Sequence, residues 1–191
     1  MGKRKAIFNI NPIIFNKWSP RSMTGEELED DIIMSLFESA RWSSSSYNNQ
    51  PWRFIYAKRN TIYWNQLFDL LLEPNKVWVK NAAVLITIIS NKNFEFNGKF
   101  SVIHQFDTGA AWENLALEAS SRNIVVHGMQ GFDYVKARKI LQVSVHFDIL
   151  AMVAIGKKGL KENLSLGLQE KEEPNDRKPL TEIIMEGKFQ E

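Results

Sequence analysis

The chain has 191 residues, of which 44% are hydrophobic and 24% charged, the ordinary composition of a globular domain. Its 24 lysines and arginines against 22 acidic residues leave a net charge of +2, so composition gives little support to nucleic-acid binding. The chain has no cysteine, which excludes disulfides, thiolate nucleophiles and zinc–thiolate sites.

Hydrophobic periodicity predicts helices and strands that alternate along the chain. In chain order, the expected elements are a helix over Glu26–Trp42, a strand over Arg53–Lys58, a helix over Thr61–Leu72, a strand over Ala83–Ile89, a helix over Phe106–Arg122, a strand over Ile124–Val126, a helix from Asp133 to Leu141 and a strand over Asp148–Ile155. The pattern therefore indicates a fold of mixed α and β structure.

Local signals predict several boundaries. Thr24 followed by Glu27 is the pattern of a capping box, so the first helix is expected to begin here. Pro74 is expected to stop the helix before it, and Asn97-Gly98 predicts a tight turn. The β-branched run Ala83–Ile89 is typical of a strand buried on both faces, so we expect it at the centre of the sheet.

The last part of the chain differs in composition from the rest. Residues 157–179 are polar and contain glycines and prolines, whereas Leu180–Phe189 alternates apolar and polar residues again. We expect one domain over residues 1–191, with 157–191 as an extended C-terminal arm. The longest apolar run, Ala82–Ile89, is too short to span a bilayer, and no signal-peptide core follows Met1–Lys5. A cytoplasmic location without a membrane partner is therefore expected.

The stretch RWSSSSYNNQPW, residues 41–52, concentrates polar side chains between an expected helix and an expected strand. Its serines, asparagines and glutamine offer hydroxyl and amide groups that can bind a flat polar ring or a polyol. Composition alone favours the simpler interpretation, a helix–strand loop whose serines cap backbone groups.

Two clusters of cations are candidates for binding phosphate. In KWSPRSMTGEEL, Lys17 and Arg21 flank Ser19, and PNDRKPL places Arg177 and Lys178 between two prolines. Charge-assisted hydrogen bonds to phosphate oxygens are short and strong, although a solvated basic turn is the commoner arrangement. Neither cluster has the glycine-rich loop of a Walker or dinucleotide fingerprint, so a nucleotide site would be built from side chains.

The stretch VHGMQGFD places Gly128 and Gly131 on either side of Gln130, between a strand and a helix. Glycines here let backbone N–H groups approach a ligand, and a tight strand–helix turn explains them equally well. His127 is interpreted as a buried core residue, because no serine or aspartate pattern makes it the base of a triad. The histidines lack ligand spacing, so we expect no metal site and assign no catalytic residue.

Six separated segments form an ordered set along the chain: WSPRSMTGEE, RWSSSSYNNQPWRFIYA, DTGAAWENLALEA, HGMQGFD, AIG and RKPLTEII. The set resembles the nitroreductase family of flavoproteins over nearly the whole chain, and SSYNNQPW is its most specific part. The resemblance implies a non-covalently bound flavin mononucleotide (FMN). It also implies an α+β fold, with helices flanking a mixed, mainly antiparallel central sheet, and an intertwined homodimer with both flavins at the interface.

The resemblance implies a role for each cation cluster. Lys17 and Ser19 match positions that bind phosphate and ribityl oxygens, and Arg21 matches a cation that reaches the flavin N1–O2 edge. Arg177 and Lys178 resemble the tail cations that close on the phosphate. Lys17 replaces a commoner arginine, and because lysine offers one point charge where arginine offers a fork, we expect lower phosphate affinity.

The remaining matches concern the flavin ring. Gln130 and Gly131 match a turn whose backbone approaches N5 and O4, and Asn75 matches an asparagine that contacts the pyrimidine ring. The polar stretch matches the loop that the partner subunit lays over the isoalloxazine, with Ser45, Ser46 and Asn48 as its contacts.

The activity implied by the resemblance is ping-pong hydride transfer. NADH or NADPH reduces FMN and leaves, and a small-molecule acceptor such as a nitroaromatic or a quinone then occupies the same face. Three alternatives stay open: a flavin-binding or storage protein without turnover, a scaffold that has lost the cofactor, and a family member that catalyses ring dehydrogenation or reductive dehalogenation.

Overall fold

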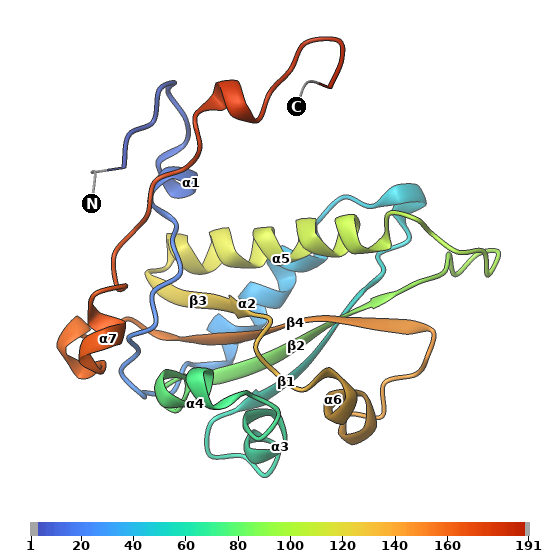
Figure 1. The fold of residues 1–191 in the computed structure, drawn as a ribbon. Helices are drawn as coiled ribbons and strands as arrows, with labels where there is room; N and C mark the ends of the chain where they lie inside the picture. The colour runs from blue at the N-terminus through green and yellow to red at the C-terminus, as the bar shows by residue number, and fades with distance from the viewer. Residues whose placement is uncertain (1–3, 190–191) are drawn as a thin grey trace.

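The computed structural model describes residues 4–189, and its centre is a four-stranded sheet (Figure 1). In chain order the strands are β1 (Trp52–Lys58), β2 (Val84–Asn91), β3 (Ile124–Met129) and β4 (Phe147–Lys157). Every neighbouring pair is antiparallel, and the order across the sheet is β1-β2-β4-β3. All the expected strands are present, although β3 continues past Val126.

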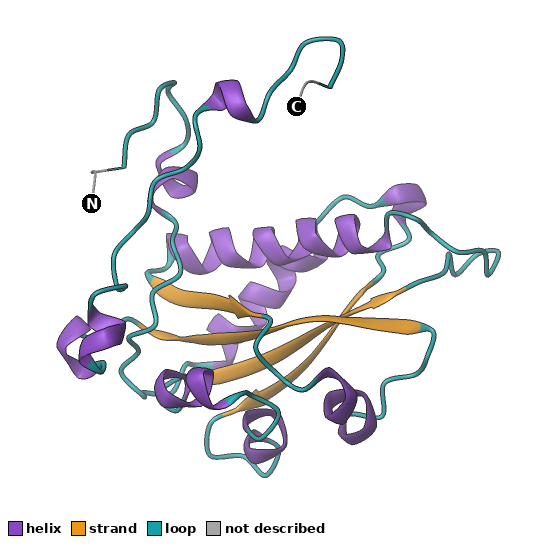
Figure 2. Cartoon of the chain, viewed as in Figure 1, coloured by secondary structure: helices purple, strands orange, loops and turns teal. Residues whose placement is uncertain are grey.

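Helices cover both faces of the sheet and give a three-layer arrangement (Figure 2). One face is covered by α2 (Asp30–Arg41) and α5 (His104–Ser121), and the other by α3 (Trp64–Phe68), α4 (Glu73–Val79) and α6 (Tyr134–Ile140). The terminal segments contain α1 (Pro12–Asn16) and α7 (Leu166–Gln169), and 3-10 turns lie at Ser46–Asn48, Lys161–Asn163 and Leu180–Glu182. The expected α+β class is confirmed.

The strand β2 lies at the centre of the sheet, as its composition predicts. Ile86 pairs with Tyr56 of β1, and Thr87 pairs with Met152 of β4. Residues 84–90 are all buried, because helices cover both faces of the strand. On one of these faces Ala111 of α5 is completely buried, and such small side chains let α5 pack closely against α2 and the sheet.

The structure corrects two helix boundaries. The first long helix, α2, begins at Asp30 and not near Glu26, because the Thr24 hydroxyl accepts a hydrogen bond only from the Glu26 N–H, at 3.2 Å, and residues 24–29 are not helical. Pro74 lies in the first turn of α4, where its fixed φ and missing N–H are tolerated. It therefore starts a helix, whereas the preceding helix, α3, already ends at Phe68.

Both terminal segments lie outside the three layers and run side by side (Figure 1). Arg4 joins them, because its guanidinium donates to the Asn175 carbonyl at 2.9 Å and to the Phe15 carbonyl at 2.7 Å. Large apolar side chains are exposed on both segments, among them Phe8 and Phe189. Across residues 4–189, no helix is both long enough and apolar enough to cross a membrane.

Gly159 lies where the C-terminal segment packs against the chain after Arg21. Its N–H donates to the Ser22 carbonyl at 2.9 Å, and an added Cβ would lie 2.8 Å from Ser22 Oγ and 2.9 Å from the Met23 carbonyl carbon. Gly159→Ala is therefore expected to lower the free energy of unfolding by about 1–3 kcal/mol, since backbone must move. Urea denaturation measures this change.

The matched control for this substitution is Gly167→Ala. An added Cβ there, in α7, has no atom within 4 Å, so the variant should be as stable as the wild type or slightly more stable. Equal urea midpoints for the two variants would contradict the steric argument.

Candidate functional site

The segment that carries Lys17 and Arg21 is fixed beside the edge strand β3. His127 of β3 donates from Nδ1 to the Pro20 carbonyl at 3.0 Å, since a carbonyl can only accept. Burial lowers the pKa of His127, so its ring is neutral near pH 7. The Arg21 guanidinium makes no hydrogen bond within residues 4–189 and lies 3.9 Å from the Glu172 carboxylate. The backbone of this segment is therefore held in place, and the Arg21 guanidinium has donors available to a ligand.

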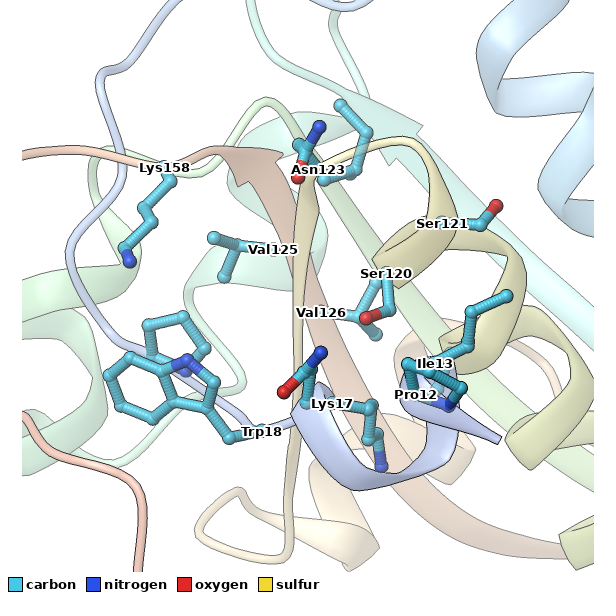
Figure 3. Close-up of a pocket in the computed structure, with 14 residues that line it drawn as sticks. Pro12, Ile13, Lys17, Trp18, Ser120, Ser121, Asn123, Val125, Val126 and Lys158 are labelled. Carbon is cyan, nitrogen blue, oxygen red and sulfur yellow. The ribbon is translucent and has the colours of Figure 1, made fainter. Parts of the chain in front are cut away.

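Lys17 lies against α5. Its ammonium is 3.2 Å from Glu113 Oε2 and 5.8 Å from the centre of the Trp112 ring system. Lys17 also lines a hollow of about 390 Å³, shown in Figure 3, together with Ser120 and Lys158. An anion that binds Lys17 therefore has to compete with Glu113 for the ammonium group.

Lys17 of the first cation cluster and both cations of the second line one hollow of about 710 Å³ between the terminal segments, whereas Ser19 and Arg21 are not among its lining residues. Lys17, Arg177 and Lys178 all line it, together with Arg4 and Glu113. The structure thus places Lys17 near Arg177 and Lys178, which are distant in the sequence. The hollow is lined by five cationic residues and by two carboxylates, Glu113 and Asp176, and this excess of positive charge suits a dianion such as phosphate.

Asn75 of α4 and the turn at Gln130 and Gly131 are in direct contact. The Asn75 side-chain amide donates to the Gly131 carbonyl at 3.0 Å. A Cβ at residue 131 would lie 2.6 Å from the Asn75 amide nitrogen, so a side chain there would displace the Asn75 amide. The backbone N–H groups of Gln130 and Gly131 donate to no acceptor within residues 4–189. Both are therefore available to acceptor atoms of a ligand.

The polar loop before β1 is held in an unusual conformation. The Ser46 N–H donates to Asp107 Oδ2 at 3.1 Å, and Ser45 Oγ accepts from the Gln50 N–H at 3.0 Å. The left-handed φ angles of this loop belong to Tyr47 (52°), Asn48 (54°) and Gln50 (47°). Non-glycine residues adopt such angles at a cost of about 1 kcal/mol or more each, so the loop has a strained shape.

This polar loop keeps some donors free and lies apart from the other predicted residues. Within residues 4–189, the Ser46 hydroxyl and the Asn48 side-chain amide make no hydrogen bond. The loop is hydrogen-bonded near the start of α5, whereas Lys17 contacts Glu113 further along that helix. Within the described residues of one chain, no hydrogen bond or ion pair links this loop to Lys17, Arg21, Arg177 or Lys178.

Ser90, His104 and Asp148 form a chain of polar contacts that the sequence does not predict. His104 Nδ1 lies 2.9 Å from Ser90 Oγ, and Nε2 lies 3.6 Å from Asp148 Oδ2. These are the residue types of a catalytic triad, but Ser90 is fully buried and its hydroxyl is also 2.8 Å from Thr108 Oγ1. Burial also lowers the pKa of His104. The cluster is therefore part of the core.

Metal binding finds no support in the described part of the chain, residues 4–189. No group of three or more histidine, cysteine, aspartate or glutamate side chains there could hold a metal ion.

Two carboxylates that the sequence does not single out contact the predicted cations. Glu113 pairs with Lys17 across 96 residues, and Glu172 contacts Arg21 across 151 residues. No local pattern marks either glutamate, because each partner is brought near only by folding. A sequence alone therefore cannot identify these two contacts.

Both the sequence and the fold have known relatives. A family model described as the nitroreductase family matches residues 14–157. A solved structure described as an oxidoreductase containing FMN is 35% identical, with a TM-score of 0.94 over 98% of this chain and 96% of that chain. No curated protein matches the chain.

More distant solved structures share the fold. A nitroreductase family protein from Clostridium difficile is 18% identical, with a TM-score of 0.72 over 95% of this chain and 100% of that chain. A nitroreductase family protein from Streptococcus pneumoniae is 18% identical, with a TM-score of 0.72 over 91% of this chain and 98% of that chain. At this identity the two structures are evidence for the fold alone.

Proposed function

The chain belongs to the nitroreductase family, and from this premise we propose that it is an oxidoreductase that uses non-covalently bound FMN. The observation that carries the proposal is a set of donors that make no hydrogen bond within residues 4–189: the backbone N–H groups of Gln130 and Gly131 after β3, and the Arg21 guanidinium and Ser19 hydroxyl in the segment that His127 of β3 holds. The 35% identical relative described as an oxidoreductase containing FMN supports the same cofactor.

The residues present fit FMN in charge and in hydrogen-bonding type. FMN combines a phosphate dianion with a flat ring whose polar edge consists largely of acceptors. Lys17, Arg177 and Lys178 supply cations around one hollow, and Arg21 supplies donors for ring acceptors. At Gly131, a side chain would displace the Asn75 amide, which is proposed to contact the ring.

The proposed contacts assign each group to a part of the cofactor. Arg21 binds the N1–O2 edge and stabilises the negative charge that develops there on reduction. The phosphate and ribityl oxygens are bound by Lys17, Ser19, Arg177 and Lys178. The backbone at Gln130 and Gly131 approaches N5 and O4, and Asn75 contacts the pyrimidine ring. Lys17 exchanges Glu113 for the phosphate, which makes FMN affinity dependent on that ion pair.

We further propose an intertwined homodimer in which the polar loop of each subunit completes the flavin site of the other. The Ser46 hydroxyl and the Asn48 side-chain amide support this role, because neither makes a hydrogen bond to any residue between 4 and 189. Large exposed side chains also support it: Phe106 of α5 is 76% exposed and Phe189 of the C-terminal arm is 79% exposed. Exposed apolar side chains of this size are available for burial against a second subunit.

Bound FMN supplies the redox chemistry, through which hydride from NADH or NADPH reaches a nitroaromatic, a quinone or a similar small-molecule acceptor in two half-reactions. The chain orients donor and acceptor in turn over one open face of the ring. Solvent can supply the proton, so we assign no catalytic side chain.

The first experiment is a visible absorption spectrum of the protein after incubation with FMN and removal of the excess. We expect bound flavin that bleaches when NADH or NADPH is added anaerobically and recovers when a quinone follows. Flavin that binds but does not bleach with either nucleotide would indicate a storage protein. Protein that stays colourless would overturn the FMN proposal.

A further inference from the structure

Glu172 is a buried carboxylate of the C-terminal segment that holds the backbone on which Arg21 sits. Only 6% of the residue is exposed. Its Oε1 accepts hydrogen bonds from the Arg21 N–H at 2.7 Å and from the Ser22 N–H at 2.8 Å. Hydrogen bonds to a carboxylate are stronger than those between neutral groups. Glu172 therefore fixes the backbone position from which the Arg21 side chain extends.

The second oxygen of Glu172 has no such partner. Oε2 is buried and accepts no hydrogen bond from any residue between 4 and 189. The Arg21 guanidinium lies 3.9 Å away, too far for a hydrogen bond and close enough for strong electrostatic attraction. A residue that only anchored the backbone would need one neutral acceptor, and a buried charged oxygen without a donor is costly. The backbone contacts alone therefore do not explain why residue 172 carries a negative charge.

We infer that Glu172 is a positioning residue that holds Arg21 toward the flavin and offsets its charge, and thereby lowers the reduction potential of bound FMN. The inference rests on the proposed function, in which Arg21 reaches the N1–O2 edge. A negative charge beside the guanidinium weakens the positive potential that Arg21 presents to the ring. Arg21 paired with Glu172 therefore stabilises the reduced flavin less than an unpaired Arg21 would.

Glu172→Gln separates the charge from the backbone contacts. The glutamine carbonyl can accept both N–H bonds, whereas the negative charge is lost. The readout is the equilibrium between oxidised and reduced bound FMN, titrated against a reference dye without any acceptor, so it does not depend on turnover. At a fixed ambient potential, the ratio of reduced to oxidised flavin is expected to rise about tenfold.

The matched control is Glu173→Gln. It removes the same charge from the next residue, an exposed carboxylate 3.2 Å from Lys161, and should leave the ratio unchanged. Glu172→Asp keeps the charge and draws it back from Arg21, so a smaller rise in the ratio is expected. If the glutamine variant does not fold, the ratio of reduced to oxidised flavin in the aspartate variant tests the inference: a rise supports it, and an unchanged ratio contradicts it.

The outcomes distinguish this inference from the proposed function. If FMN binds to all variants and Glu172→Gln leaves the ratio at the wild-type value or lowers it, Glu172 is only a backbone anchor and the inference is wrong. The proposed function would stand in that case. If the wild-type protein binds no FMN, the proposed function is wrong, and this inference, which depends on it, is wrong as well.

Discussion

Replacing Arg21 with alanine is expected to slow the reduction of bound FMN by NADH or NADPH about 100-fold. The guanidinium is the charge proposed for the N1–O2 edge, and removal of one preorganised group that stabilises developing charge typically costs about 10²–10³-fold in rate. The backbone N–H of residue 21 still donates to Glu172 in this variant, so the segment keeps its place. Anaerobic stopped-flow absorption at saturating reductant measures the effect.

Two further variants make this measurement specific. Arg122→Ala removes an exposed arginine that pairs with Glu118 at 2.6 Å at the end of α5, and should leave the rate unchanged. Arg21→Lys keeps a charge without the planar fork and should recover part of the rate. If Arg21→Ala binds as much FMN as the wild type and is reduced equally fast, Arg21 does not stabilise the reduced flavin.

Mixing two defective variants is expected to restore flavin binding if the site is shared between subunits. The first variant, Lys17→Ala with Arg21→Ala, removes the cations of one side. The second, Ser46→Ala with Asn48→Gly, removes the loop donors, and glycine tolerates the φ of 54° at residue 48. In a heterodimer one site carries all four substitutions and the other site carries none. Random pairing then gives about a quarter of all sites wild-type affinity.

The measurement is the fraction of bound FMN after the two variants are unfolded together and refolded. The FMN concentration is set between the dissociation constants of the wild-type protein and the variants. Each variant refolded alone is the control and should bind little FMN. If the loop and the cations serve a site within one chain, every site in the mixture carries a defect. Binding no greater than the mean of the two controls would then rule out the shared site.

Much of the fold follows from short-range signals. The apolar run at residues 83–89 predicts the central strand, because only a strand covered on both faces buries every side chain. Asp133 caps α6 through the Lys136 N–H at 2.8 Å, and Gly98 has a φ of 70° in the expected turn. Each of these features depends on residues that are close in the sequence, so the local sequence pattern is enough to predict it.

Tertiary structure decided what neighbouring residues cannot specify. Thr24 carries a capping-box signal, yet α2 starts at Asp30, and Leu28 is buried in the core from the non-helical segment before it. In the candidate site, the residue types and their order came from the sequence and its family resemblance. Folding alone brought Glu172 to Arg21, because such a contact depends on how distant segments pack and leaves no pattern along the chain.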